Sequence, residues 1–390
     1  MIQPSSARPW LAPLVPLYRL GLFARELGLR TGLKPVRRLR WPVVSIGNLS
    51  TGGAGKTPLV IALTQALTRR GLHIDVLSRG YGRLGRVAAR VDPDGTAEEF
   101  GDEPLEIARE AGVRVYVAAQ RYQAGLLAER EAEEFGKTKG TGLRQCAKPS
   151  NMAGTSAPET NDSRGQEVSG DDLSRAANVP ISERALAPAG TVSGIHLLDD
   201  GFQHRQLHRD IDILLINPSD VEDRLLPAGN LREPLRAARR ASCLAIPADN
   251  PEIESAMKAW GWQGSIWRLH RKMEVPSIDG PVVAFCGIAR PEQFFAGCER
   301  SGLHLAARIA FPDHHRYTPR DLDRLLNAAR GSDATVFLTT EKDRARLGSL
   351  GAGFAELHGL KTAALHIEIE DLALEWLMGR LLSRLPEPHR

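Results

Sequence analysis

Residues 50–57 read STGGAGKT, a composition typical of loops that bind phosphate groups. Glycines let backbone N–H groups approach phosphate oxygens, and a helix that starts here directs its positive end at the anion. Lys56 adds a positive charge, and the Thr57 hydroxyl can bind Mg²⁺. Ser50 stands where the usual pattern has glycine, and a glycine-rich helix start with a solvated lysine is the structural alternative. We predict a nucleotide-binding loop made of Ser50, Thr51, Gly52, Gly53, Ala54, Gly55, Lys56 and Thr57.

Two pairs of carboxylates follow the loop. Asp102 and Glu103 stand in the motif GDEP at an expected helix start, where helix capping is the structural alternative. Asp199 and Asp200 end an apolar run, LLDD, that is typical of a buried strand. Ligands bind at the carboxyl ends of strands in open α/β sheets, and an aspartate there suits Mg²⁺.

Three further segments carry charged groups before expected helices. Arg232 lies in LPAGNLREP, where it could neutralise a phosphate group or simply be a surface charge at a helix cap. His314 and His315 lie in FPDHHRYT, and a pair of histidines is more often structural or exposed. The charges of TTEKD at 339–343 are consistent with helix capping alone.

The elements that would position these residues alternate between strand and helix. Such alternation predicts an α/β fold, a P-loop NTPase-like parallel sheet with helices on both faces. We expect strands at 41–47, 73–78, 113–118, 195–199, 211–217, 282–286, 303–310 and 335–339. We expect helices at 17–29, 58–70, 102–110, 120–135, 291–301, 319–329 and 372–385.

The 390 residues suggest two domains, in line with the usual size of about 100–200 residues each. We expect a kinase-type P-loop domain at 41–275 and a smaller C-terminal α/β domain at 276–390. Residues 136–194 have no aromatic side chain and are rich in small, polar and charged residues, so they predict a disordered, low-complexity insertion. The terminal helix could pack on either domain.

The net charge of +4 is unevenly distributed. Residues 1–40 carry eight basic groups and one acid, whereas the remaining chain is slightly acidic. This charge distribution argues against a general nucleic-acid-binding protein. The longest uncharged run of this arm, 9–18, is too short to span a bilayer, and its basic residues follow the apolar ones, unlike a signal peptide. The arm either docks on an anionic membrane or packs on the body. The four cysteines have no zinc-site spacing, which favours a reducing cytosolic setting.

In combination, the motifs resemble the tetraacyldisaccharide 4'-kinase family, the lipid A 4'-kinases. The matching segments follow the family's order and cover most of residues 40–345. They are VVSIGNLSTGGAGKTP, SRGYGR, GDEP, LLDDGFQHRQLHRDIDI, LPAGNLREP, FCGIARPEQF, FPDHHRYT and LTTEKD. The family accepts serine or threonine at the first loop position, so Ser50 is not anomalous.

The resemblance implies ATP- and Mg²⁺-dependent phosphorylation of the 4'-hydroxyl of a tetraacylated glucosamine disaccharide 1-phosphate, a step of lipid A synthesis. It implies a peripheral enzyme on the cytoplasmic face of the bacterial inner membrane, with the arm on the anionic surface, and neither nucleic acid nor an obligate protein partner is expected. The catalytic candidates are Asp102 as base, His314 paired with it, Lys56 and Arg232. The candidates for Mg²⁺ are Thr57, Glu103 and Asp200, and those for the acceptor are Arg121, Asp199, Gln203 and His204.

Two other functions remain compatible with the motifs. A P-loop kinase of another sugar or of a nucleoside would not need the apolar arm. A membrane-surface NTPase switch would hydrolyse nucleotide without phosphorylating lipid, but the lysine typical of such switches is replaced by Thr51.

Overall fold

The computed structural model describes residues 8–51, 55–142, 194–288, 290–313 and 315–382. The chain divides into two units, residues 1–129 with 194–386 and residues 130–193 with 387–390. Every strand that the structure describes belongs to the first unit. Of the second unit it describes residues 130–142, the last part of helix α5.

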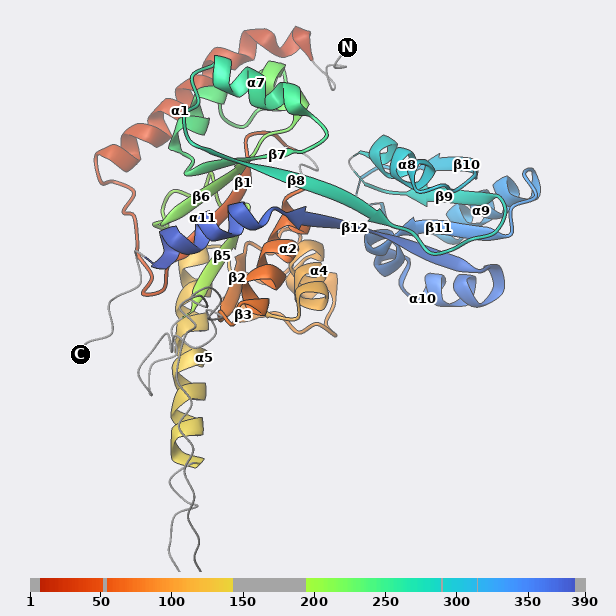
Figure 1. Cartoon of the computed structure of the whole chain (residues 1–390), viewed down its shortest axis with the longest axis horizontal. Coiled ribbons are helices and arrows are strands. Elements are labelled where there is room, and N and C mark those ends of the chain that lie inside the picture. The colour runs from red at the N-terminus through yellow and green to blue at the C-terminus, as the bar shows by residue number, and fades with distance from the viewer. Residues whose placement is uncertain (1–7, 52–54, 143–193, 289, 314, 383–390) are drawn as a thin grey trace, which may run out of the picture. The chain divides into compact units, whose positions relative to one another are not determined.

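The chain alternates between strands and helices over most of its described length (Figure 1). The strands are β1 (Val43–Asn48), β2 (Ile74–Ser78), β3 (Ala89–Arg90), β4 (Arg114–Val117), β5 (Ile195–Asp199), β6 (Ile211–Leu215), β7 (Cys243–Pro247), β8 (Ser265–Glu274), β9 (Val282–Cys286), β10 (Leu305–Ala310), β11 (Val336–Thr340) and β12 (Leu360–Ile369). The α-helices are α1 (Val15–Arg30), α2 (Lys56–Arg69), α3 (Ala97–Phe100), α4 (Asp102–Ala111), α5 (Arg121–Gly142), α6 (Pro218–Glu222), α7 (Pro251–Ala259), α8 (Pro291–Arg300), α9 (Pro319–Arg330), α10 (Glu341–His358) and α11 (Asp371–Leu382). The 3₁₀ helices among the described residues are η1 (Pro9–Leu14) and η3 (Leu235–Arg240).

The described strands form one sheet in the order β10-β9-β11-β12-β8-β7-β6-β1-β5-β2-β4-β3. Neighbours are parallel except β12 with β8 and β3 with β4. Strand β1 lies between β5 and β6, so the ends of β1 and β5 meet at one edge of the sheet. This arrangement confirms the predicted α/β class and brings the phosphate-binding loop next to Asp199 and Asp200.

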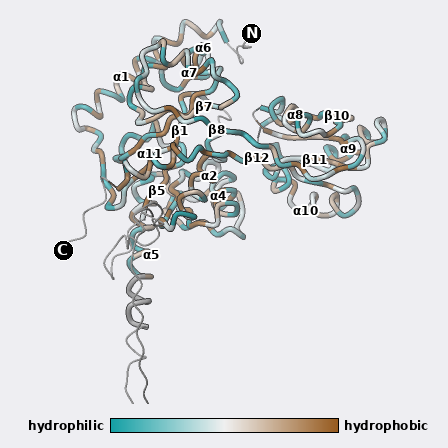
Figure 2. Tube along the Cα trace, in the orientation of Figure 1, coloured by the Kyte–Doolittle hydropathy of each residue, from teal (hydrophilic) through white to brown (hydrophobic). Residues whose placement is uncertain are grey.

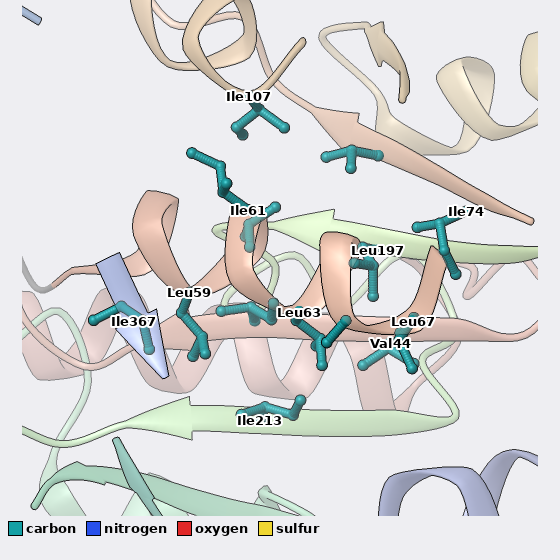
Figure 3. Close-up of a cluster of buried hydrophobic side chains, with 14 of the residues drawn as sticks. Val44, Leu59, Ile61, Leu63, Leu67, Ile74, Ile107, Leu197, Ile213 and Ile367 are labelled. Carbon is teal, nitrogen blue, oxygen red and sulfur yellow. The ribbon is translucent and has the colours of Figure 1, made fainter. Parts of the chain in front are cut away.

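Alternate residues of the central strands enter different cores, which shows that helices cover both faces of the sheet. Val44 and Ile46 of β1 pack in the core that contains α2, α4 and α11, whereas Val43 packs with α5 on the other face. Figure 3 shows the first core, where α2 lies along the strands and presents Leu59, Leu63 and other apolar side chains to them. Burial of these side chains fixes the start of α2 against the end of β1.

Strands β8 and β12 are ten residues each and pair antiparallel, which links the two parts of the sheet. Beyond them, β9, β10 and β11 carry α8, α9 and α10 (Figure 1). The terminal helix α11 returns to the P-loop part, because Leu374 and Leu377 are buried in the core of α2. The predicted domain boundary near 275 stays a prediction.

The structure departs from the sequence-based expectations in several places. Strands β3, β7, β8 and β12 and helices α3, α6 and α7 were not expected. Helix α5 continues to Gly142, although the sequence pattern predicted an end near residue 135, and residues 143–193 of the predicted insertion lie outside the described residues. Helix α1 begins at Val15, two residues before the expected start, and a 3₁₀ turn precedes it. Hydrophobic and hydrophilic residues alternate along α1, as expected (Figure 2).

Gly47 near the end of β1 offers a test of this packing. A Cβ atom at Gly47 would lie 2.5 Å from the Cβ of Phe202 and 2.8 Å from its backbone nitrogen. We expect Gly47→Ala to lower the free energy of unfolding by about 1–3 kcal/mol, because this buried strand has no room for a methyl group. Urea unfolding measures the change, and Gly21→Ala is the control, because nothing lies within 4 Å of a Cβ there. Equal stability of Gly47→Ala and the unmodified protein would contradict the packing.

Candidate functional site

The predicted phosphate-binding loop connects β1 to α2. Gly55 has a left-handed φ of 84° immediately before the first residue of α2, Lys56. A residue with a side chain rarely adopts this conformation, so glycine is favoured here. The side chains of Ser50 and Thr57 are buried. Three members of the predicted loop lie outside the described residues, namely Gly52, Gly53 and Ala54.

The segment LPAGNLREP lies directly against this loop. The backbone N–H of Thr51 donates to the carbonyl of Asn230 at 2.8 Å, and Ser50 forms an isolated bridge with Leu231. The backbone N–H of Arg232 donates to the carbonyl of Leu49 at 2.7 Å. These bonds place the Arg232 side chain beside the loop, where the sequence analysis expected it.

The Asp200 carboxylate forms the centre of the described site. Arg232 donates to it through both terminal nitrogens, at 2.9 and 3.1 Å, and the Lys56 ammonium lies 3.5 Å away. Asn48 at the end of β1 accepts from the same two cations, from Lys56 at 3.1 Å and from Arg232 at 2.7 Å. Lys56, Asp200 and Arg232, separated by long stretches of sequence, therefore form one network.

The backbone and the charge of Asp200 are both unusual. Its φ is +46°, a conformation that aspartate tolerates better than most residues and that turns the chain sharply after β5. Burial alone would raise the pKa of this carboxyl, but Lys56 and Arg232 outweigh burial and lower the pKa to about 2. Asp200 is therefore a fixed anion at neutral pH.

Asp199 differs from its neighbour. Its side chain is buried and accepts a hydrogen bond from the Ser78 hydroxyl at 3.0 Å, while its Oδ1 has no partner among the described residues. Burial and the carboxylates of Glu103 and Asp200 raise the pKa of Asp199 to about 7, despite the opposing charge of Lys56. Such a carboxyl gains from a bound cation, because the cation stabilises its charged form.

The other predicted pair, Asp102 and Glu103, forms the first turn of α4. Asp102 is partly exposed, with its Oδ2 3.7 Å from Nε of Arg346 on α10. A second contact joins the same helices, since Lys342 lies 3.0 Å from Glu106. Lys342 belongs to the motif TTEKD, so this motif does more than cap a helix.

Three of the acceptor candidates surround the same network. Arg121, the first residue of α5, is buried and donates to the backbone carbonyl of Asp200 at 3.3 Å. Gln203 donates to the carbonyl of Asn48 at 2.8 Å. His204 follows in the same loop. Burial, together with Arg121 and other arginines, lowers the pKa of His204 to about 4. It is therefore neutral at pH 7 and suits a hydroxyl partner better than a phosphate.

Of the two histidines of FPDHHRYT, the structure describes only His315. His314 lies outside the described residues. The ring of His315 stacks on Phe311, with 4.8 Å between ring centroids, and its Nε2 lies 3.1 Å from Asp321 at the start of α9. His315 is thus engaged in the packing of its own part of the chain.

The donor set fits Mg²⁺. Asp199 presents a buried carboxylate oxygen that has no partner in the described part of the chain. Thr57, Glu103 and Asp200 add oxygen donors of the kind that Mg²⁺ prefers. Within the described ranges, no three His, Cys, Asp or Glu side chains form a ready cation site. This is consistent with an ion that takes most of its ligands from water and nucleotide phosphates.

Two parts of the site were not predicted from the sequence. Asn48 was not singled out, although a polar residue at the end of an apolar strand was a usable signal. Arg25 of α1 donates to the Gln203 carbonyl at 2.9 Å and to Glu233 at 3.1 Å, and Glu233 also accepts from Arg240. No spacing in the sequence connects Arg25 with residues about 200 positions away.

Comparison with known proteins gives a consistent result. A family model described as Tetraacyldisaccharide-1-P 4'-kinase (LpxK) matches residues 7–135 and 176–382. The match spans the phosphate-binding loop, both carboxylate pairs and Arg232, and it leaves out residues 136–175 of the predicted insertion.

Individual relatives agree with the family model. A protein named tetraacyldisaccharide 4'-kinase from Koribacter versatilis is 35% identical over 373 residues, covering 93% of this chain and 96% of the relative. A protein of the same name from Geobacter sulfurreducens is 32% identical, and the match covers 85% of this chain and 82% of the relative. A crystal structure of LpxK from Aquifex aeolicus in complex with ATP has a TM-score of 0.63 and 26% identity, covering 96% of this chain and 99% of that chain.

The low pKa of His204 leads to a measurable pH dependence. Its pKa is about 4 in the folded protein against an ordinary 6.5, so the unfolded chain binds the proton more readily between these values. Stability is therefore lost as pH falls from 6.5 towards 4. We expect His204→Gln to lose less of its free energy of unfolding over this interval than the unmodified protein. Denaturant unfolding at several pH values measures this, and parallel curves for the two proteins would contradict the assignment.

Proposed function

The chain belongs to the tetraacyldisaccharide-1-P 4'-kinase family, and on this premise we propose that it transfers the γ-phosphate of ATP to the 4'-hydroxyl of a tetraacyl-disaccharide 1-phosphate in lipid A synthesis. The observation that carries the proposal is the network of Lys56, Asp200 and Arg232 at the phosphate-binding loop. Two cations held on one carboxylate next to a glycine-rich loop suit the transfer of a phosphate group.

The loop side of the network binds ATP. Backbone N–H groups at the start of α2 and the Lys56 ammonium hold the β- and γ-phosphates. Thr57, Glu103 and Asp200 hold Mg²⁺, directly or through water, and the ion neutralises charge on the phosphates when it is bound. Arg232 lies beside the transferred phosphate, where the positive charge of its guanidinium would offset the charge on the phosphate oxygens.

The acceptor side needs a base for the 4'-hydroxyl. Asp102 is the proposed base, because it is partly exposed at the start of α4 and next to Glu103. In the reaction, the hydroxyl oxygen forms a bond to the γ-phosphorus, the bond from that phosphorus to the β,γ-bridging oxygen breaks, and Asp102 takes the hydroxyl proton. His314 is the proposed partner that tunes Asp102.

The acceptor lies among Arg121, Asp199, Gln203 and His204. Arg121 supplies charge for the 1-phosphate, and neutral His204 and Gln203 supply hydrogen bonds to the sugar. Asp199, with its unpartnered oxygen, lies where acceptor and ion meet.

The N-terminal arm serves as the membrane contact. One side of α1 packs on the body, where the Tyr18 hydroxyl donates to the Arg232 carbonyl at 2.8 Å. The other side leaves Leu17, Leu20 and Phe23 more than 60% exposed beside basic residues. No helix among the described residues is long and apolar enough to cross a bilayer. We place the enzyme peripherally, on the cytoplasmic face of the inner membrane, with no obligate protein partner.

The catalytic assignment predicts two distinct defects. We expect Lys56→Ala to abolish transfer from labelled ATP to the lipid disaccharide, mainly through kcat, while lipid binding remains. We expect Asp102→Asn to lower kcat by about 10²–10⁴-fold with little change in ATP binding. ATP hydrolysis without lipid phosphorylation by the unmodified protein would instead indicate an NTPase switch.

The membrane assignment predicts loss of vesicle binding from the arm alone. We expect Leu17→Ser with Phe23→Ser to weaken binding to anionic vesicles at least roughly tenfold, because about 1.5–3 kcal/mol per buried apolar side chain is lost. Activity on detergent-dispersed substrate should remain. Leu365→Ser, an exposed leucine on β12, is the control. Binding that is unchanged in the arm variant, or that does not depend on salt, would overturn the assignment.

A further inference from the structure

The loop of residues 79–88, between β2 and β3, exposes an unusual set of side chains. Tyr81 is 80% exposed, Leu84 86% and Val87 82%. These values exceed the exposure of any of the large apolar side chains of α1. The loop contains three arginines and no acid. Nothing in the proposed reaction at the phosphate-binding loop uses these apolar side chains.

Backbone contacts hold the 79–88 loop in place. The N–H of Leu84 donates to the carbonyl of Glu98 at 2.8 Å, and the Arg83 guanidinium donates to the carbonyl of Val87 at 2.7 Å. Gly101 lies so close that a Cβ there would be 2.8 Å from the carbonyl oxygen of Tyr81. The apolar side chains are therefore presented to solvent by an anchored loop, at a cost that a partner surface would offset.

The arginines of the loop gather around a hollow. A cavity of about 430 Å³ is lined by residues 79–83, 85 and 86 of the loop and by Ala119. Its lining includes Arg79, Arg83 and Arg86 but no carboxylate. Guanidinium groups bind phosphate oxygens in a bidentate manner. An anionic surface therefore complements the loop, and a basic surface would be repelled.

The position of the loop relates it to the site. It follows the carboxyl end of β2, at the same sheet edge as the end of β5, because β2 and β5 are parallel. Gly101, against which it packs, directly precedes Asp102. Helix α1 also contacts this edge of the sheet, because Arg25 donates to the carbonyl of Gln203. Two segments with exposed apolar and basic side chains thus border one site.

We propose that the 79–88 loop is a second membrane-docking surface, which inserts Tyr81, Leu84 and Val87 into an anionic bilayer while its arginines pair with lipid phosphates. The inference rests on the proposed function, since a lipid acceptor is delivered from a bilayer. Two linked contacts bind more tightly than either one, and they fix the orientation of the sheet edge towards the membrane.

The test uses the full chain and vesicles of phosphatidylcholine with or without phosphatidylglycerol. We expect Leu84→Ser with Val87→Ser to weaken binding to the anionic vesicles roughly tenfold. We expect Arg86→Ala to weaken it about fivefold, and only when phosphatidylglycerol is present. The matched controls are Leu372→Ser, 75% exposed on α11, and Arg320→Ala, exposed on α9. Both should bind as the unmodified protein does.

Activity on detergent-dispersed substrate separates this inference from the proposed function. The loop variants should keep their kcat and KM there, because the loop is assigned to the bilayer and not to the acceptor. Unchanged vesicle binding of both loop variants would overturn the inference. A raised KM in detergent with normal vesicle binding would also overturn it, and would assign the loop to the acyl chains of the acceptor. Absence of kinase activity in the unmodified protein would instead refute the proposed function. The vesicle-binding results of the loop variants would still decide whether the 79–88 loop docks on a bilayer.

Discussion

The ion pairs on the Asp200 carboxylate are the interaction on which the rest of the site depends. They join three segments, because Lys56 starts α2, Asp200 follows β5 and Arg232 lies in the loop after α6. Removing Asp200 would leave two partly buried cations without their shared counter-ion, an unfavourable arrangement. The positive φ of Asp200 and the side-chain amide of Asn48 support these ion pairs. Both place polar groups at the carboxyl ends of β5 and β1.

Helix α1, which carries the exposed apolar side chains, is attached to this same network. Tyr18 of α1 donates to the backbone of Arg232, and Arg25 of α1 contacts both Gln203 and Glu233. The helix with the exposed apolar side is thereby fixed to the residues next to the loop between β1 and α2. This coupling joins an exposed apolar helix face to the charged sheet edge of a chain whose family is named for a tetraacyldisaccharide 4'-kinase.

Local pattern predicted much of the fold, because β1, α2, β5 and α9 combine clear apolar periodicity with glycine, proline or capping residues. Strands β8 and β12 escaped prediction, although polar and apolar side chains alternate along β8. Their pairing joins residues about 100 positions apart, which no local pattern shows. The candidate site was found where chemistry is concentrated in short motifs, as at Lys56 and Asp200. The contact of Arg25 with Glu233, and that of Lys342 with Glu106, could not be predicted, because each depends on tertiary packing and not on spacing.

The kinetics of Arg232→Lys would decide whether the network on Asp200 organises phosphoryl transfer. Lysine keeps the positive charge but cannot form the bidentate hydrogen bonds to Asp200 together with the hydrogen bond to Asn48. The account predicts a fall in kcat of about 10²–10³-fold with a near-normal KM for the lipid acceptor and an unchanged circular dichroism spectrum. A folded Arg232→Lys enzyme with the kcat of the unmodified protein would contradict it.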